Sequence, residues 1–120
     1  MVTPPLVPTG HAYNEERSLW LHRAIAERLR ADPAVVLEKA RSNLAQARRV
    51  HGPSVLPYLR HWDALLDGPL DRLTTVMTSL TQEARDLRQC TPFAGVLSAQ
   101  ERWGVYRAFR RWWEGEVGRA

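Results

Sequence analysis

The sequence predicts an all-α protein, a compact bundle of about six helices preceded by an extended proline-rich arm. Apolar residues recur at three- and four-residue spacing along most of the chain, which is typical of helices with one buried face. Val, Ile and Thr do not gather in alternating runs, so no strand is expected. Proline and glycine stand mainly where one helical pattern stops and the next begins.

We expect two regions, an arm over residues 1–14 and a single helical domain over residues 15–120. The arm holds several prolines and shows no helical period, so an extended conformation is expected. A chain of 120 residues can bury roughly two-thirds of its unfolded surface without a metal or a disulfide. The single cysteine, Cys90, rules out an internal disulfide, and no cofactor is expected.

The first two helices are predicted to meet at Asp32-Pro33. The first spans about residues 15–31, with Asn14 as its cap. Proline suits the first position of the second helix, and Asp32 can cap that new turn. The second helix ends at Gly52-Pro53. Their apolar faces consist of Leu21, Ile25 and Leu29 in the first helix and Leu37, Ala40, Leu44 and Ala47 in the second.

Three shorter helices follow in the prediction. The third is entered through Ser54 or Pro57 and stops at the turn residues Asp67-Gly68-Pro69. The fourth covers about residues 69–78. The segment Ser79–Gln82 resembles a capping box and begins a fifth helix that ends at Gln89. The expected buried stripes are Tyr58, Leu59, Trp62, Leu65 and Leu66 in the third helix and Leu70, Leu73, Val76, Met77 and Leu80 along the fourth.

The last part of the chain combines a loop with the clearest helix start in the sequence. The mostly apolar segment from Cys90 to Leu97 contains Pro92 and cannot be helical throughout, so we expect a loop tucked into the body. Ser98 and Glu101 then form a capping-box pattern, in which each side chain can bond to the other's backbone N–H. The last helix is predicted to run from there to about Glu116.

This last helix carries five of the ten aromatic residues of the chain within eleven positions. Its apolar arc spans roughly 180°, wider than the about 100° that a surface helix needs to face its own core. One interpretation makes the helix the central pillar of the bundle. The other makes part of the arc a docking surface for a second polypeptide, since Trp, Tyr and Arg dominate interface hot spots. The candidate partner-binding residues are Trp103, Arg107, Arg110, Arg111, Trp112 and Trp113.

A formal charge of +4 is compatible with nucleic acid, but it does not require it. Acidic residues are interleaved with the arginines, which favours ordinary solvated helix faces. The helices near residues 69–90 nevertheless suggest an alternative, a helix-turn-helix in a transcriptional regulator. Its second helix would expose side chains suited to base edges. These candidate nucleic-acid-binding residues are Gln82, Arg85, Arg88 and Gln89.

No catalytic motif stands out, and we expect a protein that is not an enzyme. The four histidines are dispersed and form no HExxH pair, so neither a catalytic nor a metal-binding residue is assigned. His61 and Asp63 fall on different helical faces, which does not suit a base and its orienting partner. Cys90 has no evident histidine to activate it, and a buried, inert thiol is expected there.

Two stretches, Glu16–Leu29 and Thr91–Trp103, resemble a group of small, mostly uncharacterised helical proteins of GC-rich bacteria. Some of that group resemble the antitoxin or regulator half of toxin–antitoxin gene pairs. The resemblance implies a regulator that binds and neutralises a partner protein, with a toxin-like enzyme encoded nearby as the candidate partner. It assigns no functional residue. In several of these proteins a helix-turn-helix segment precedes this region, where the present sequence has its proline-rich arm.

The expected function is therefore a non-enzymatic, antitoxin-like protein-interaction module. A DNA-binding regulator and a structural or oligomerising helical protein are the alternatives. The sequence has no apolar run of about 18 residues that would span a membrane, and its first residues lack the order of a signal peptide. We therefore expect a cytoplasmic protein without a membrane partner.

Overall fold

The structure is a computed structural model that describes residues 10–119. Within those residues it contains six α-helices and no strand, which confirms the all-α prediction. Residues 1–9 of the predicted arm lie outside the described residues. The helices are α1 (Gly10–Ala31), α2 (Pro33–Val50), α3 (Leu56–Asp67), α4 (Leu70–Met77), α5 (Gln82–Gln89) and α6 (Ala99–Arg119).

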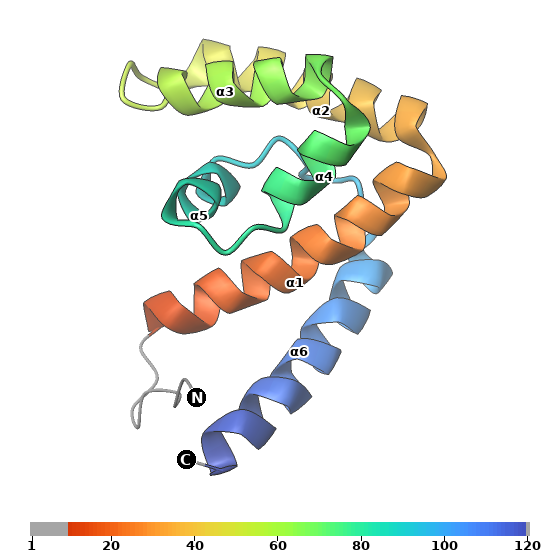
Figure 1. Cartoon of the computed structure of the whole chain (residues 1–120), viewed down its shortest axis with the longest axis vertical. Coiled ribbons are helices and arrows are strands. Elements are labelled where there is room, and N and C mark those ends of the chain that lie inside the picture. The colour runs from red at the N-terminus through yellow and green to blue at the C-terminus, as the bar shows by residue number, and fades with distance from the viewer. Residues whose placement is uncertain (1–9, 120) are drawn as a thin grey trace.

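The central element of the fold is α1, which packs against α2, α4, α5 and α6. Helices α2 and α3 lie side by side at one end of the molecule, and α4 and α5 fill the space between them and α1 (Figure 1). Among the described helices, α6 packs against α1 alone. The interpretation of the last helix as the central pillar is therefore wrong, because α1 has that position.

The core lies where α1 to α5 converge on the loop that precedes α6. Trp62 of α3 is fully buried, and its indole Nε1 donates to the backbone oxygen of Leu87 at 2.9 Å. Phe93 of the loop meets the Trp62 ring edge-on, with 5.5 Å between the ring centroids. Phe93 and Leu97 are both buried, so the loop is tucked into the body as the sequence predicts.

The loop is tied to α2 by polar contacts. The side-chain amide of Asn43 donates to the backbone oxygens of Pro92 and Ala94, at 2.7 Å and 2.8 Å. Gly95 has a φ of +79°, and a Cβ atom there would lie 3.2 Å from Cε of Lys39. Both the left-handed backbone and the close Lys39 stem therefore favour glycine at this turn.

One histidine is part of the core. His22 of α1 is buried, its Nδ1 lies 2.7 Å from the backbone oxygen of Ser18, and its Nε2 lies 2.8 Å from Thr91 Oγ1. A neutral ring with its proton on Nδ1 satisfies both contacts, because the Thr91 hydroxyl can donate to Nε2. Burial is the main cause that lowers the pKa of His22 from 6.5 to about 4. This side chain stays uncharged at neutral pH.

Most helix boundaries follow the prediction, but α1 begins five residues before the expected Glu15. Tyr13 explains the difference, because its ring packs edge-on against Phe109 of α6, with 5.0 Å between centroids. A contact with a helix far along the chain thus supports a helical turn that the local sequence does not predict.

Two expected caps are also corrected. Asp32 precedes α2 but makes no side-chain capping hydrogen bond. The cap of α5 is Thr81 and not Ser79, since Thr81 Oγ1 accepts from the backbone N–H of Ala84 at 3.2 Å. The Ser79 hydroxyl instead lies 3.3 Å from the Thr81 hydroxyl. The helix therefore starts later than the capping-box pattern indicates.

Two residues of the expected buried stripes are exposed. Tyr58 is 36% exposed, because the side of α3 that faces the core is centred on Leu59 and Trp62. Leu80 is 61% exposed. It lies beyond Met77, where α4 ends, so the helical spacing that placed it on the buried stripe no longer applies.

Candidate partner-binding surface

The first residues of α6 are fixed by the predicted capping box. The Glu101 carboxylate accepts from the backbone N–H of Ser98 at 2.9 Å, and the Ser98 hydroxyl accepts from the backbone N–H of Glu101 at 3.1 Å. The other carboxylate oxygen of Glu101 pairs with Arg28 in the last turn of α1. Glu101 therefore starts α6 and also attaches it to the end of α1.

An aromatic cluster holds the opposite ends of the same two helices together. Phe109 is fully buried between Tyr13 and Trp20 of α1, and its centroid lies 5.0 Å and 5.7 Å from theirs. Trp113 meets Tyr13 edge-on at 5.4 Å. Such edge-to-face contacts add about 0.5–1.5 kcal/mol each beyond the apolar area they bury. We call α1 and α6, joined by these contacts, the α1–α6 pair.

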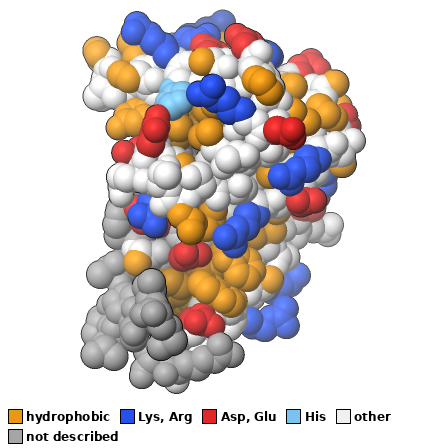
Figure 2. All heavy atoms as spheres, in the orientation of Figure 1, with side chains coloured by type: hydrophobic (Ala, Val, Ile, Leu, Met, Phe, Trp, Pro, Cys, Tyr) orange, Lys and Arg blue, Asp and Glu red, His pale blue; other side chains and the backbone are white. Residues whose placement is uncertain are grey.

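One side of the α1–α6 pair carries a wide apolar groove of about 720 Å³. Trp20 and Ala24 of α1 line it opposite Gly104, Val105 and Ala108 of α6. Charged side chains line the groove as well, namely Glu27 and Arg28 of α1 and Glu101 of α6. Figure 2 shows hydrophobic side chains gathered over the part of the molecule where α1 and α6 lie.

The other side of the pair carries a smaller pocket of about 410 Å³, which we call the arginine pocket. Aromatic and cationic side chains share it, and Ala99 completes its wall. Its aromatic members are Tyr13, Trp103 and Tyr106, and its cationic members are Arg17, Arg102, Arg107 and Arg110.

The structure divides the predicted partner-binding residues between these two sides. Trp103, Arg107 and Arg110 line the arginine pocket, and Trp103 is 64% exposed. Trp112 lies one turn beyond Ala108, on the side of the groove, and its ring lies 5.5 Å from that of Trp20. Trp112 is 39% exposed.

The remaining two predicted residues differ in burial. Arg111 is exposed, whereas Trp113 is half-buried against Tyr13. The sequence suggests one continuous docking surface on the last helix, but the crossing of α1 separates its members into two faces.

The structure also brings residues of α1 into the surface that the sequence interpretation left out. Tyr13, Arg17 and Trp20 line the two faces, although the sequence predicts that Tyr13 lies in the arm. Their spacing of four and three residues is the signal that could have found them, since it places all three on one side of a helix. This spacing is informative only if α1 extends back to Gly10, because Tyr13 must be helical to share a side with Arg17 and Trp20.

The candidate nucleic-acid-binding residues of α5 do not form an exposed set. Arg88 is only 4% exposed, and its guanidinium donates to the backbone oxygens of Met77 and Ser79 at 3.2 Å and 2.7 Å. The expectation that Arg88 is exposed is therefore wrong, because its charge is used to cap the end of α4. Gln82 is exposed and donates to Asp86 at 2.9 Å.

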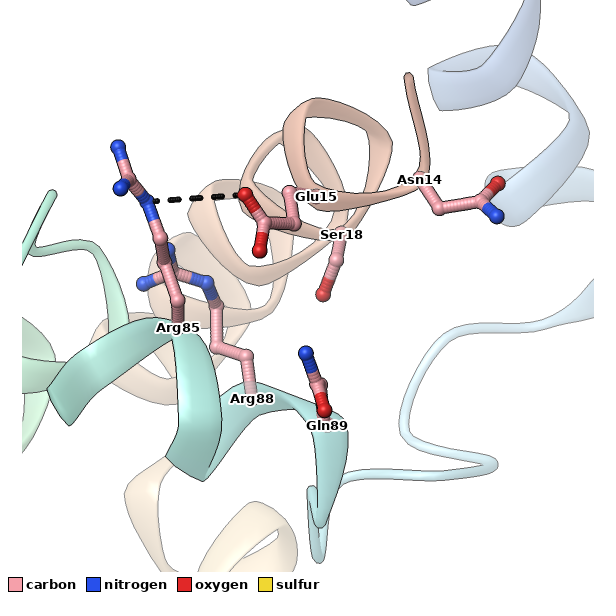
Figure 3. A pocket seen from close by; sticks show the side chains of 6 residues that line it. All are labelled: Asn14, Glu15, Ser18, Arg85, Arg88 and Gln89. Carbon is pink, nitrogen blue, oxygen red and sulfur yellow. Dashed lines mark ion pairs between the residues drawn. The ribbon is translucent and has the colours of Figure 1, made fainter. Parts of the chain in front are cut away.

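The other two members of that set border a pocket of about 300 Å³ between α5 and the first turns of α1. Figure 3 shows Arg85 and Glu15 directed toward one another, with 3.9 Å between Arg85 Nε and the carboxylate. Gln89 lies at the edge of the same pocket. With Arg85 beside a carboxylate and Arg88 buried, α5 offers little free positive charge to a phosphate backbone.

Two groups with reactive side chains are held in unreactive forms. Burial, with a smaller contribution from Asp86, raises the pKa of the Cys90 thiol. The protein thus favours the thiol over the nucleophilic thiolate. The low pKa of His22 leaves its ring neutral and occupied by two hydrogen-bond partners. Within residues 10–119, no group of three His, Cys, Asp or Glu side chains is placed to hold a metal ion.

No family model, curated protein or solved structure matches this chain. None of the helices that the structure describes is long and apolar enough to cross a membrane.

Proposed function

We propose that this chain is a non-enzymatic protein-interaction module, an antitoxin-like regulator that binds and neutralises a partner protein through the α1–α6 pair. The observation that carries the proposal is the exposure of Trp103 and Trp112 on a helix with α1 as its one helical neighbour in the described structure. Exposed large aromatic side chains mark interaction sites, and tryptophan is enriched among the residues that dominate binding energy at protein interfaces.

The distribution of apolar surface supports this proposal. The body of the molecule buries its core side chains, among them Trp62, Phe93 and Met77, although Tyr58 and Leu80 are exposed there. The α1–α6 pair buries Phe109 but leaves an apolar groove on one side. A rim of arginines beside exposed aromatic rings would also speed encounter with a partner of opposite charge.

The proposal is tested by co-expressing the tagged chain with the product of the gene beside its own. We expect a heteromer that survives gel filtration. Trp112→Ala should weaken that complex by roughly tenfold or more, as truncation of a hot-spot tryptophan does. The same substitution should lower the melting temperature by only a few degrees.

Tyr58→Ala is the matched control, because Tyr58 is an equally exposed aromatic residue on α3, outside the α1–α6 pair. It should leave the complex intact. A chain that elutes alone beside its neighbour's product contradicts the proposal, and so does a complex that Trp112→Ala and Tyr58→Ala affect equally. Self-association without the neighbour would favour an oligomerising protein instead.

A further inference from the structure

The lining of the arginine pocket consists almost entirely of arginines and aromatic residues. Four of its eight lining residues are arginines and three are aromatic, and no Asp or Glu lines it. Both helices contribute, with Arg17 and Tyr13 from α1 and the rest from α6. The pocket therefore exists only because α6 packs along α1.

Two arginines of this pocket, Arg17 and Arg102, are held in place without being neutralised by a carboxylate. The Arg17 guanidinium lies over the Tyr106 ring, 5.1 Å from its centroid, and 5.9 Å from that of Tyr13. Arg102 donates to the backbone oxygen of Leu97 at 3.1 Å, a contact with a neutral group. Neither residue forms an ion pair with a carboxylate of the described residues.

The other two arginines are more exposed. Arg110 Nε lies 3.1 Å from Glu114, in a pair that is open to water on both sides. Such exposed pairs contribute about 0–1 kcal/mol and separate readily. Arg107 is exposed and has no ion-pair partner among the described residues. The pocket thus keeps an excess of positive charge next to the exposed ring of Trp103.

We infer that the arginine pocket binds an acidic segment of the partner protein, in which carboxylates flank an apolar side chain. A guanidinium stacked on an aromatic ring keeps its N–H edge free, and that edge matches a carboxylate in bidentate geometry. Trp103 supplies the apolar contact between the charges. This inference names the chemistry of the partner and rests on the proposed function.

The surroundings of the pocket favour a short acidic peptide over nucleic acid. A nucleic-acid strand needs cations spaced along its backbone, each of which neutralises a phosphate. Here four arginines gather in one pocket, and carboxylates interrupt the positive charge further along α6. Acidic residues follow it on α6, at Glu114 and Glu116. A phosphate strand that left the pocket along α6 would meet these carboxylates.

Fluorescence anisotropy with a labelled synthetic peptide tests the inference. The peptide carries Glu at alternate positions around a central Trp, and a second peptide replaces each Glu with Gln. We expect the whole chain to bind the Glu peptide roughly tenfold or more tightly than the Gln peptide, with affinity that falls as salt rises. Equal binding of the two peptides would overturn the inference, and so would an oligothymidine strand that displaces the Glu peptide at lower concentration.

Arg107→Glu and Arg72→Glu provide the matched pair of variants. Both change the net charge equally and both side chains are exposed, but Arg72 lies on α4, outside the pocket. Arg107→Glu should weaken binding of the Glu peptide by roughly tenfold or more, whereas Arg72→Glu should change it by less than about twofold. Equal effects of both variants would mean attraction by net charge alone and would contradict a built site.

The same two variants separate the inference from the proposed function. The heteromer with the neighbour's product can form and be weakened by Trp112→Ala but not by Arg107→Glu. In that case the proposed function stands and the inference is wrong. If no heteromer forms but the Glu peptide still binds at Arg107, the inference stands and the proposed partner is wrong.

Discussion

Trp62 of α3 and Trp103 of α6 are the same side chain in opposite surroundings. Trp62 is fully buried, its N–H is bonded to the Leu87 carbonyl, and its ring packs against Phe93. Trp103 is mostly exposed and lines an open pocket. The first belongs to the helical body, which comprises α2 to α5 and the loop before α6, and the second to the α1–α6 pair.

The two regions also differ in the burial and pairing of their polar side chains. Where α1 meets the body, His22 and Arg88 are buried and their hydrogen bonds are satisfied. Every buried side-chain nitrogen or oxygen among the described residues has a partner. The α1–α6 pair instead keeps several arginines in water beside aromatic rings. We therefore expect the body to contribute most of the folding stability and the α1–α6 pair to provide an exposed surface for binding.

The largest expected effect is that of Trp62→Ala in the body. The substitution leaves a cavity against Phe93 and removes the hydrogen bond to Leu87. We expect the free energy of unfolding to fall by about 3–5 kcal/mol, as for other large aromatic residues in cores. Urea unfolding followed by circular dichroism measures it. A loss below about 1 kcal/mol, the range of ordinary surface changes, would mean that the body is not the stable region.

The second effect concerns pH and the buried His22. Its pKa is about 4 in the folded protein and 6.5 as a free side chain, so below pH 6.5 the unfolded chain binds the proton more readily. The stability that this residue contributes is complete above pH 6.5 and is lost as the pH falls toward 4. The gap between the two pKa values corresponds to about 3 kcal/mol.

Urea unfolding at several pH values between 4 and 7 measures this loss. His22→Gln should flatten the dependence over that range, although it also lowers stability at pH 7. His51→Gln is the control, because His51 is exposed and should leave the dependence unchanged. If the His22→Gln and wild-type curves ran parallel, the histidine would have to be accessible to water, and the contact between α1 and the loop would be looser than in the structure.

The sequence predicts the body well because its signals are local. Proline and glycine at the helix boundaries, and apolar residues at helical spacing, place α2, α3 and α4 within a residue or two of where they lie. The Ser98–Glu101 capping box is confirmed in both of its hydrogen bonds. Leu80 is the instructive exception, since the spacing continues beyond the point where α4 ends.

The candidate surface is less predictable because it depends on contacts between distant segments. Trp103 and Trp112 both belong to a wide aromatic arc on α6, but only the position of α1 decides that they face different sides. Tyr13 is helical because it packs on Phe109, ninety-six positions later in the chain. Arg88 resembles a solvent-exposed cation in the sequence, but the carbonyls that bind it belong to the last residue of α4 and to the turn that follows.

The smallest expected effect is that of Trp103→Ala, which should change the free energy of unfolding by less than about 0.5 kcal/mol, as an exposed position predicts. The measurement needs two protein concentrations. If the substitution is nearly neutral at both, the ring is free in the isolated chain, as a docking residue must be. If the loss rivals that of Trp62→Ala and grows with concentration, a second copy already covers Trp103, because self-association stabilises the folded chain more at higher protein concentration. The α1–α6 pair would then be a dimer interface, and the contrast between the exposed ring of Trp103 and the buried ring of Trp62 would not hold for the protein in solution.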